Sequence, residues 1–188
     1  MSQTLEIAAI QAHLAWENPI ENRAYFDQKI NELKQQVDLI ILPEMFATGF
    51  SMSPQERADT GETLGWMKVQ AAQTNSALAG SLMIEEDGKF FNRFYFVTPK
   101  GDITYYDKRH TFTLAGEHKV YARGKEKVIV NYKGWKLLLQ ICYDLRFPNL
   151  YRKLSKGGAL FLTVPSAFTE TTGKKHWHSL LKARAIEN

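Results

Sequence analysis

The sequence contains a single cysteine, Cys142, among its 188 residues. No disulfide can therefore form within the chain, and a zinc ribbon or a redox pair of cysteines is excluded. This composition suits a reducing compartment, so we expect a cytoplasmic location. Long apolar runs are also lacking, and Glu6 interrupts the short one near the N-terminus, with no basic segment before it. We therefore expect neither a signal peptide nor a membrane partner.

Charge of one sign is not concentrated anywhere in the chain. The 24 Lys and Arg residues against 20 Asp and Glu residues give a formal net charge of +4. The basic residues are scattered over the whole length, and no basic arm is present that could follow a phosphate backbone. We expect no nucleic-acid partner. A basic nucleic-acid-binding module stays the weakest alternative, because the many aromatic residues could stack on bases.

The hydrophobic residues, 44% of the chain, suffice for one substantial core, so we expect a single domain over residues 1–188. Short apolar segments bounded by turn residues predict strands at 5–12, 39–42, 77–84, 90–97, 103–106, 128–132, 135–141 and 159–164. Helical patterns predict helices that follow Asn18, that end near Asn75, and that cover 149–156 and 174–188. Helices that alternate with apolar strands indicate an α/β layered domain with its helices outside.

Three polar residues each follow a predicted strand: Glu44, Lys108 and Cys142. Taken separately they indicate little, because a lone cysteine behind an apolar strand is usually an inert core residue. A lone lysine or glutamate is usually exposed. Together they offer a thiol, a carboxylate and a cation, which are groups that nucleophilic catalysis with a general base and a stabilised oxyanion can use.

The segments around these residues resemble the three signature segments of the nitrilase superfamily, in which a glutamate, a lysine and a cysteine follow in this chain order. The matching segments read LPEMF at 42–46, YYDKRH at 105–110 and LQICYD at 139–144. The resemblance continues through 143–148, 164–168, 171–173, 176–177 and 183–188, and so covers nearly the whole chain. The segments 139–144 and 167–177 are most similar to the omega-amidase branch, which hydrolyses the terminal amide of dicarboxylic acid monoamides.

The resemblance implies a nitrilase-like αββα sandwich and a hydrolase that acts on carbon–nitrogen bonds other than peptide bonds. It implies a small-molecule amide substrate, release of ammonia through a cysteine thioester, no metal or cofactor, and a homodimer or higher homo-oligomer. An acidic omega-monoamide is the expected substrate.

The same resemblance assigns the site residues. Cys142 is the expected nucleophile, Glu44 the base and acid, and Lys108 the oxyanion stabiliser. Four further residues have supporting roles: Glu117 positions the lysine and the substrate, the backbone N–H of Tyr143 binds the oxyanion, and Phe168 and Thr172 shape the pocket.

Members of the superfamily continue well past the segment that corresponds to residues 185–188, through further strands. We therefore expect the domain to be truncated at its C-terminus and to lack its C-terminal strands. A non-catalytic subunit or a fragment of the same fold is the main alternative. A Cys-His hydrolase also stays open in principle, because the chain contains five histidines.

Overall fold

The computed structural model describes the backbone of residues 4–155, 159–164 and 170–187. It describes their side chains except at 153–155, 159–164, 170–172 and 174. Within these residues, no helix is both long enough and apolar enough to cross a membrane.

Two sheets form the centre of the molecule. The larger sheet contains β1 (Ile7–Ala9), β2 (Leu39–Ile41), β3 (Ala77–Glu86), β4 (Lys89–Val97) and β5 (Ile103–Asp107), in that spatial order. Its first three strands are parallel, whereas β4 and β5 are antiparallel to their neighbours. The smaller sheet contains β6 (Ile129–Tyr132), β7 (Trp135–Ile141) and β8 (Ala159–Val164). Here β6 and β7 form a hairpin, and β8 is parallel to β7.

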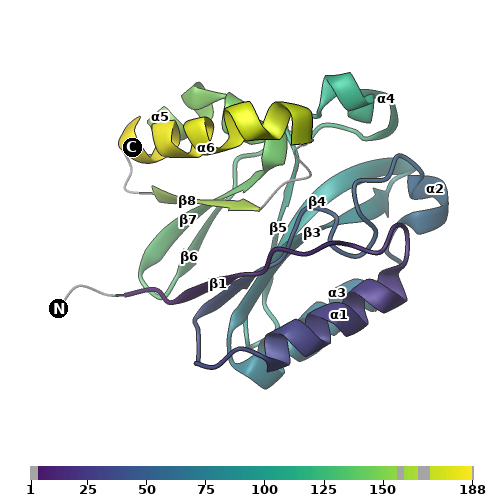
Figure 1. The fold of residues 1–188 in the computed structure, drawn as a ribbon, viewed down its shortest axis with the longest axis vertical. Coiled ribbons are helices and arrows are strands. Elements are labelled where there is room, and N and C mark those ends of the chain that lie inside the picture. Colours follow the sequence, from purple (N-terminus) through teal and green to yellow (C-terminus); the bar gives the residue numbers. More distant parts are fainter. Residues whose placement is uncertain (1–3, 156–158, 165–169, 188) are drawn as a thin grey trace.

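Helices cover the outer face of each sheet. The described helices are α1 (Pro19–Asn31), α2 (Pro54–Arg57), α3 (Glu62–Thr74), α4 (Glu117–Val120), α5 (Pro148–Ser155) and α6 (Glu170–Glu187), and the 3₁₀ turns are η1 (Thr113–Ala115) and η2 (Cys142–Arg146). α1 and α3 lie against the larger sheet, and α5 and α6 lie beyond the smaller one (Figure 1). The layers are therefore α, β, β and α, as the resemblance implied.

The two largest apolar clusters of the described residues lie one on each face of the larger sheet. Phe26 of α1 and Met67 of α3 pack under it, and both are fully buried. Between the sheets, apolar side chains such as Phe94 of β4 meet Leu139 of β7. A strand that is buried on both faces must be apolar throughout, and β2 is buried at all of its positions. This explains the continuous apolar run from Leu39 to Leu42.

The predicted elements are all present, with changed ends. α1 begins at Pro19 behind the cap residue Asn18, whose side chain accepts a hydrogen bond from the Glu21 N–H, as the capping pattern predicts. β1 is shorter than the apolar run at 5–12. α6 begins at Glu170 rather than at 174; its threonines and Gly173 have weak helix propensity, so the sequence predicts a later start. The short elements α2, α4, η1 and η2 are not predicted from the sequence.

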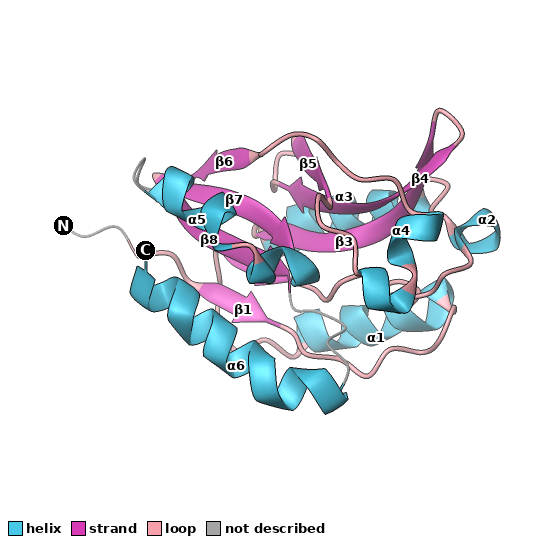
Figure 2. Ribbon diagram, turned by 90° about the horizontal axis from the view of Figure 1, so that it is seen from above, coloured by secondary structure: helices cyan, strands magenta, loops and turns pink. Residues whose placement is uncertain are grey.

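The elements that matter for the site lie at one end of the sheets. β3 and β4 form a long hairpin in the middle of the molecule. The short helices α2 and α4 lie together at one end of the molecule, beside this hairpin (Figure 2). At Gly80 of β3, a Cβ would lie 2.8 Å from Cδ1 of Phe46 and 3.1 Å from Cβ of Leu42. The missing side chain therefore lets the segment around Glu44 pack directly on β3.

We expect Gly80→Ala to lower the free energy of unfolding by about 1–3 kcal/mol, because the added methyl overpacks a ring that is fully buried. Urea denaturation measures this loss. Gly65→Ala is the matched control: it lies inside α3, and no described atom would lie within 4 Å of its Cβ. It should raise the free energy of unfolding by about 0.5–1 kcal/mol. A Gly80→Ala protein as stable as the parent contradicts this account of the packing.

Candidate active site

Glu44 lies in a turn that begins where β2 ends. Pro43 removes a backbone donor after the strand, and Met45 adopts a left-handed conformation with φ of 46°. The Met45 N–H donates to Oγ of Ser81 at 2.9 Å, and the Phe46 N–H donates to the Ser81 carbonyl at 3.2 Å. Ser81 of β3 thus binds the backbone N–H of Met45, the residue with the left-handed conformation, and that of the residue after it. Glu44 is buried in this turn and is only 2% exposed.

Lys108 follows β5 and is held through its backbone. Its N–H donates to the Asn92 carbonyl at 3.0 Å, and its carbonyl accepts from the Gly124 N–H at 2.9 Å. A Cβ on Gly124 would lie 2.0 Å from the Asp107 carbonyl oxygen, so only glycine permits this approach. The Lys108 side chain points inward and is 1% exposed.

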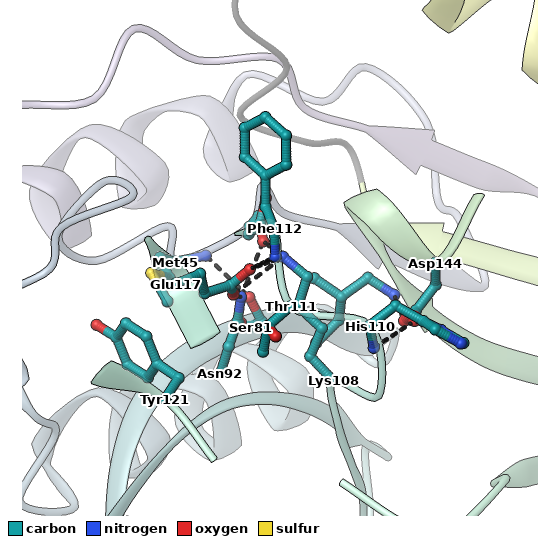
Figure 3. A network of polar contacts seen from close by, with 12 residues as sticks. Met45, Ser81, Asn92, Lys108, His110, Thr111, Phe112, Glu117, Tyr121 and Asp144 are labelled. Atoms are coloured by element: carbon teal, nitrogen blue, oxygen red, sulfur yellow. Dashed lines mark hydrogen bonds and ion pairs between the residues drawn. The ribbon is translucent and has the colours of Figure 1, made fainter. Parts of the chain in front are cut away.

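The Lys108 ammonium joins the carboxylates of Glu44 and Glu117 in the interior, and Figure 3 shows Lys108 and Glu117 in this network. Its Nζ lies 2.7 Å from Oε1 of Glu44, and 3.0 and 2.9 Å from the two carboxylate oxygens of Glu117. The Phe50 ring centre lies 5.2 Å from Nζ, within the range of a cation–π contact. Glu117 is fully buried at the start of α4. Sequence-predicted residues from three separate segments therefore meet in one cluster.

Two neutral donors complete this cluster. The side-chain amide of Asn92 donates to Glu44 Oε1 at 2.8 Å and to Glu117 Oε1 at 3.2 Å. The Phe112 N–H donates to the other oxygen of Glu117. Buried carboxylates require such donors, because a buried charge without partners is very unfavourable.

The protonation of the cluster depends on its internal charges. Burial alone lowers the pKa of Lys108, but the negative charges of Glu44, Cys142 and Glu117 outweigh burial and raise that pKa above its ordinary value. The ammonium form is thus favoured. Burial raises the pKa of Glu117; Lys108 opposes this rise, and the nearby Glu44 charge adds to it. The cluster therefore keeps its cation at neutral pH, while Glu117 holds a proton more readily than an exposed glutamate.

Cys142 lies at the end of β7, where the chain turns sharply. Its φ is 43°, a left-handed conformation that is unfavourable for a residue with a Cβ. It is 5% exposed, and a thiolate there is close enough to affect the pKa of Lys108. The next N–H, that of Tyr143, lies in the first turn of η2, where backbone donors lack partners within the helix. The strained turn thus presents a thiol and an adjacent backbone donor together.

Asp144 ties this turn to the segment that carries Lys108. Its carboxylate accepts from the Ile141 N–H at 3.0 Å and from the Tyr106 hydroxyl at 2.7 Å. It also accepts from the His110 N–H at 3.1 Å and lies 2.6 Å from Nδ1 of the His110 ring (Figure 3). The His110 ring stacks on Phe147, with 3.7 Å between ring centres. Asp144 thereby fixes the position of Cys142 relative to Lys108.

The structure brings five of the predicted site residues together, and two lie outside what it describes. Glu44, Lys108 and Glu117 are in direct contact, Cys142 lies within reach of the Lys108 charge, and the Tyr143 N–H is adjacent to Cys142. Phe168 and the side chain of Thr172 lie outside the described residues. Across the described part of the chain, no group of three or more His, Cys, Asp or Glu side chains could hold a metal ion.

Sequence reasoning missed Asn92 and the roles of Phe112 and Asp144. The signal for Asn92 is its position in the aromatic strand Phe90–Val97: it shares a face with Phe94 and Phe96, which are fully buried. A polar residue on an otherwise apolar inward face must have partners. The backbone donor of Phe112 leaves no such signal.

Comparisons with known proteins agree with this geometry. A family model described as carbon-nitrogen hydrolase matches residues 6–188. The chain is 40% identical over 186 residues to the omega-amidase YafV of Yersinia enterocolitica, which covers 98% of this chain and 71% of that protein. It is 32% identical over 187 residues to the 2-oxoglutaramate amidase of Bacillus subtilis, which covers 97% of this chain and 72% of that protein.

The solved structures include a CN-hydrolase superfamily protein of Xanthomonas campestris with an arsenic adduct in its active site. It superimposes with a TM-score of 0.90 at 38% identity, covering 98% of this chain and 72% of that one. Nit3 of Saccharomyces cerevisiae, at 24% identity and a TM-score of 0.85, shares the fold. The chain belongs to the carbon-nitrogen hydrolase family, within the omega-amidase branch of the nitrilase superfamily, and is a hydrolase of non-peptide carbon–nitrogen bonds.

Proposed function

We propose that the protein hydrolyses the terminal amide of a small acidic omega-monoamide, with Cys142 as nucleophile. The observation that carries this proposal is the buried Lys108 ammonium, which lies between Glu44 and Glu117 and within reach of the Cys142 charge. Such an arrangement combines a base, a cation and a thiol in a site with little water.

In the first half of the reaction, Glu44 takes the thiol proton and the Cys142 sulfur attacks the amide carbonyl carbon. The Lys108 ammonium and the Tyr143 N–H stabilise the oxyanion that forms on the former carbonyl oxygen. The carbon–nitrogen bond then breaks, and Glu44 returns the proton to the leaving nitrogen. Ammonia departs, and the acyl group remains on sulfur as a thioester.

In the second half, water attacks the thioester carbon while Glu44 accepts a proton from it. The same two donors stabilise the second oxyanion. The carbon–sulfur bond breaks, the thiolate is protonated, and the carboxylic acid product leaves. One carboxylate serves both halves because it returns to its starting protonation state after each.

The substrate class rests on the relatives. Two proteins that this chain resembles over nearly its whole length are an omega-amidase and a 2-oxoglutaramate amidase. The latter name describes a small amide that bears carboxylate groups. We extend this class to the present chain and include Phe168 and Thr172 in the pocket that binds it.

Self-association and a reducing location are part of the same proposal. α6 carries two exposed apolar side chains on different sides of the helix, Leu181, 36% exposed, and Ile186, 84% exposed. We propose the homodimer on the family resemblance alone. Light scattering at several protein concentrations tests this assembly.

A thiol nucleophile suits the reducing cytoplasm.

We expect Cys142→Ala to lower ammonia release from omega-monoamides of keto-dicarboxylic acids by about 10³-fold or more, because the covalent route is lost. A coupled ammonia assay over a panel of acidic and neutral amides measures the rate and ranks the substrates. Mass spectrometry of acid-quenched parent protein should show the acyl group on the peptide that contains Cys142.

Urea denaturation is the control that the Cys142→Ala variant still folds. A folded variant that keeps the parent rate contradicts the assignment of the nucleophile. Absence of ammonia release from the parent with every amide contradicts the amidase proposal itself and favours a non-catalytic member of the fold.

Removal of the cation tests the charge balance of the site. We expect Lys108→Met to lower the free energy of unfolding by about 3–5 kcal/mol at pH 8, because two buried carboxylates lose their counter-charge. Without Lys108, the pKa of Glu117 rises further above its ordinary value of 4.5. At pH values above 4.5, the native state of the variant then binds more protons than its unfolded state, so the free energy of unfolding of the variant falls as pH rises. Urea denaturation should therefore show a smaller loss at pH 5 than at pH 8.

Lys133→Met is the matched control. Lys133 pairs with Asp38 on the surface, and its side chain is 47% exposed. Loss of this pair should change the free energy of unfolding by at most about 1 kcal/mol. The pKa of Asp38 lies below its ordinary value because of Lys133, so the contribution of the pair is lost only at more acidic pH, and the loss should be equal at pH 5 and 8. An equal loss for Lys108→Met at both pH values contradicts the charge coupling.

A further inference from the structure

We propose that Asn92 is a positioning residue of the active site: its side-chain amide holds the carboxylates of Glu44 and Glu117 side by side and keeps Glu44 ready to accept a proton. This inference rests on the proposed role of Glu44 as the base. It assigns a function to a residue of β4 that lies outside the glutamate, lysine and cysteine segments.

The backbone of β4 places Asn92 at the centre of the cluster. Asn92 is 1% exposed and pairs in register with Met83 of β3. Its amide nitrogen contacts both carboxylates, at 2.8 and 3.2 Å, and its carbonyl accepts from the Lys108 N–H at 3.0 Å. One residue is thus bonded to all three charged members of the cluster.

The number of donors shows what Asn92 contributes. An ammonium has three protons, and Lys108 makes three contacts, one with Glu44 and two with Glu117. Two like charges beside one cation repel each other, and a hydrogen bond to a carboxylate favours its ionised form. The two N–H groups of Asn92 supply one such bond to each carboxylate.

The acceptor of the same side chain has no partner. Within the described residues, Oδ1 of Asn92 is buried and accepts no hydrogen bond, which is unfavourable for stability. In Asn22, another buried asparagine, both the amide nitrogen and the amide oxygen have partners. The nitrogen donates to the Ala15 and Ala47 carbonyls at 2.7 Å each, and the oxygen accepts from the Ala15 N–H at 2.8 Å. In the described residues, the side chain of Asn92 therefore serves the cluster as a donor, with one hydrogen bond to Glu44 and one to Glu117.

Several titratable groups lie around the two carboxylates and have to be considered in a test by pH. In the described part of the chain they are Glu44 after β2, Lys108 after β5, Glu117 and Tyr121 of the α4 segment, and Cys142 after β7. Burial and the charges of Glu117 and Glu44 raise the pKa of Tyr121, whose hydroxyl donates to the Ser51 carbonyl at 2.8 Å. Tyr121 therefore stays neutral, and the pH dependence reports on the other four groups.

The experiment compares the parent with Asn92→Leu, which keeps the branched heavy-atom shape and removes both donors, and with Asn92→Gln, which restores an amide. We expect Asn92→Leu to lower kcat about 10–100-fold with KM changed by less than about threefold. The acid limb of kcat/KM should move to higher pH by about one unit, because the ionised carboxylates lose a hydrogen bond each. Asn92→Gln should recover part of both changes. Asn22→Leu is the control: it removes a buried asparagine that contacts only backbone and should leave the acid limb unchanged.

A second measurement separates this inference from the proposed reaction. The rate of alkylation of Cys142 by iodoacetamide, followed against pH in protein shown to be folded by urea denaturation, needs no turnover. Its pH dependence should move in Asn92→Leu and not in Asn22→Leu. If the parent releases no ammonia, the proposed function fails, and alkylation alone decides the role of Asn92. If neither the acid limb nor the alkylation profile of folded Asn92→Leu differs from the parent, Asn92 has no positioning role.

Discussion

The buried ammonium of Lys108 is the interaction on which the site depends. Lys108, Glu44 and Glu117 are each at most 2% exposed, and none could be ionised there without the others, because an isolated buried charge is strongly unfavourable. The three side chains come from the segment after β2, the segment after β5 and the start of α4. The cluster therefore forms only when these distant segments have come together, so the site is a product of the complete fold.

The order of strands explains how the segments meet. β2 and β5 are not neighbours, because β3 and β4 lie between them. The end of parallel β2, the start of antiparallel β4 and the end of β5 nevertheless share one edge of the sheet. Ser81 of β3 and Asn92 of β4 fill the intervening positions, and each bonds to a neighbouring segment of the site. β3 and β4 therefore support the site and also contribute side chains to it.

Much of this arrangement could be predicted from local patterns. The apolar run before Glu44 and the strands predicted at 103–106 and 135–141 placed Glu44, Lys108 and Cys142 at strand ends, and the order of the three segments indicated the family. The contacts made by Asp144 could not be predicted, because Tyr106 and His110 are 38 and 34 residues away in sequence. The pairing of Asn92 with two carboxylates likewise depends on strand register. Helices as short as α4 are also beyond local prediction, since they are stabilised by tertiary contacts and not by propensity.

The same contacts bear on the timing of the proposed reaction. In the resting site all three Lys108 protons face carboxylate oxygens, so none is available for an oxyanion. When Glu44 takes the proton of Cys142 it loses its negative charge and becomes a weaker acceptor. The Lys108 proton that faced Glu44 can then turn toward the oxyanion as it forms, while Glu117 still holds the ammonium through two oxygens. Proton transfer to the base and stabilisation of the oxyanion are therefore coupled through one cation, which favours the transition state over the resting state.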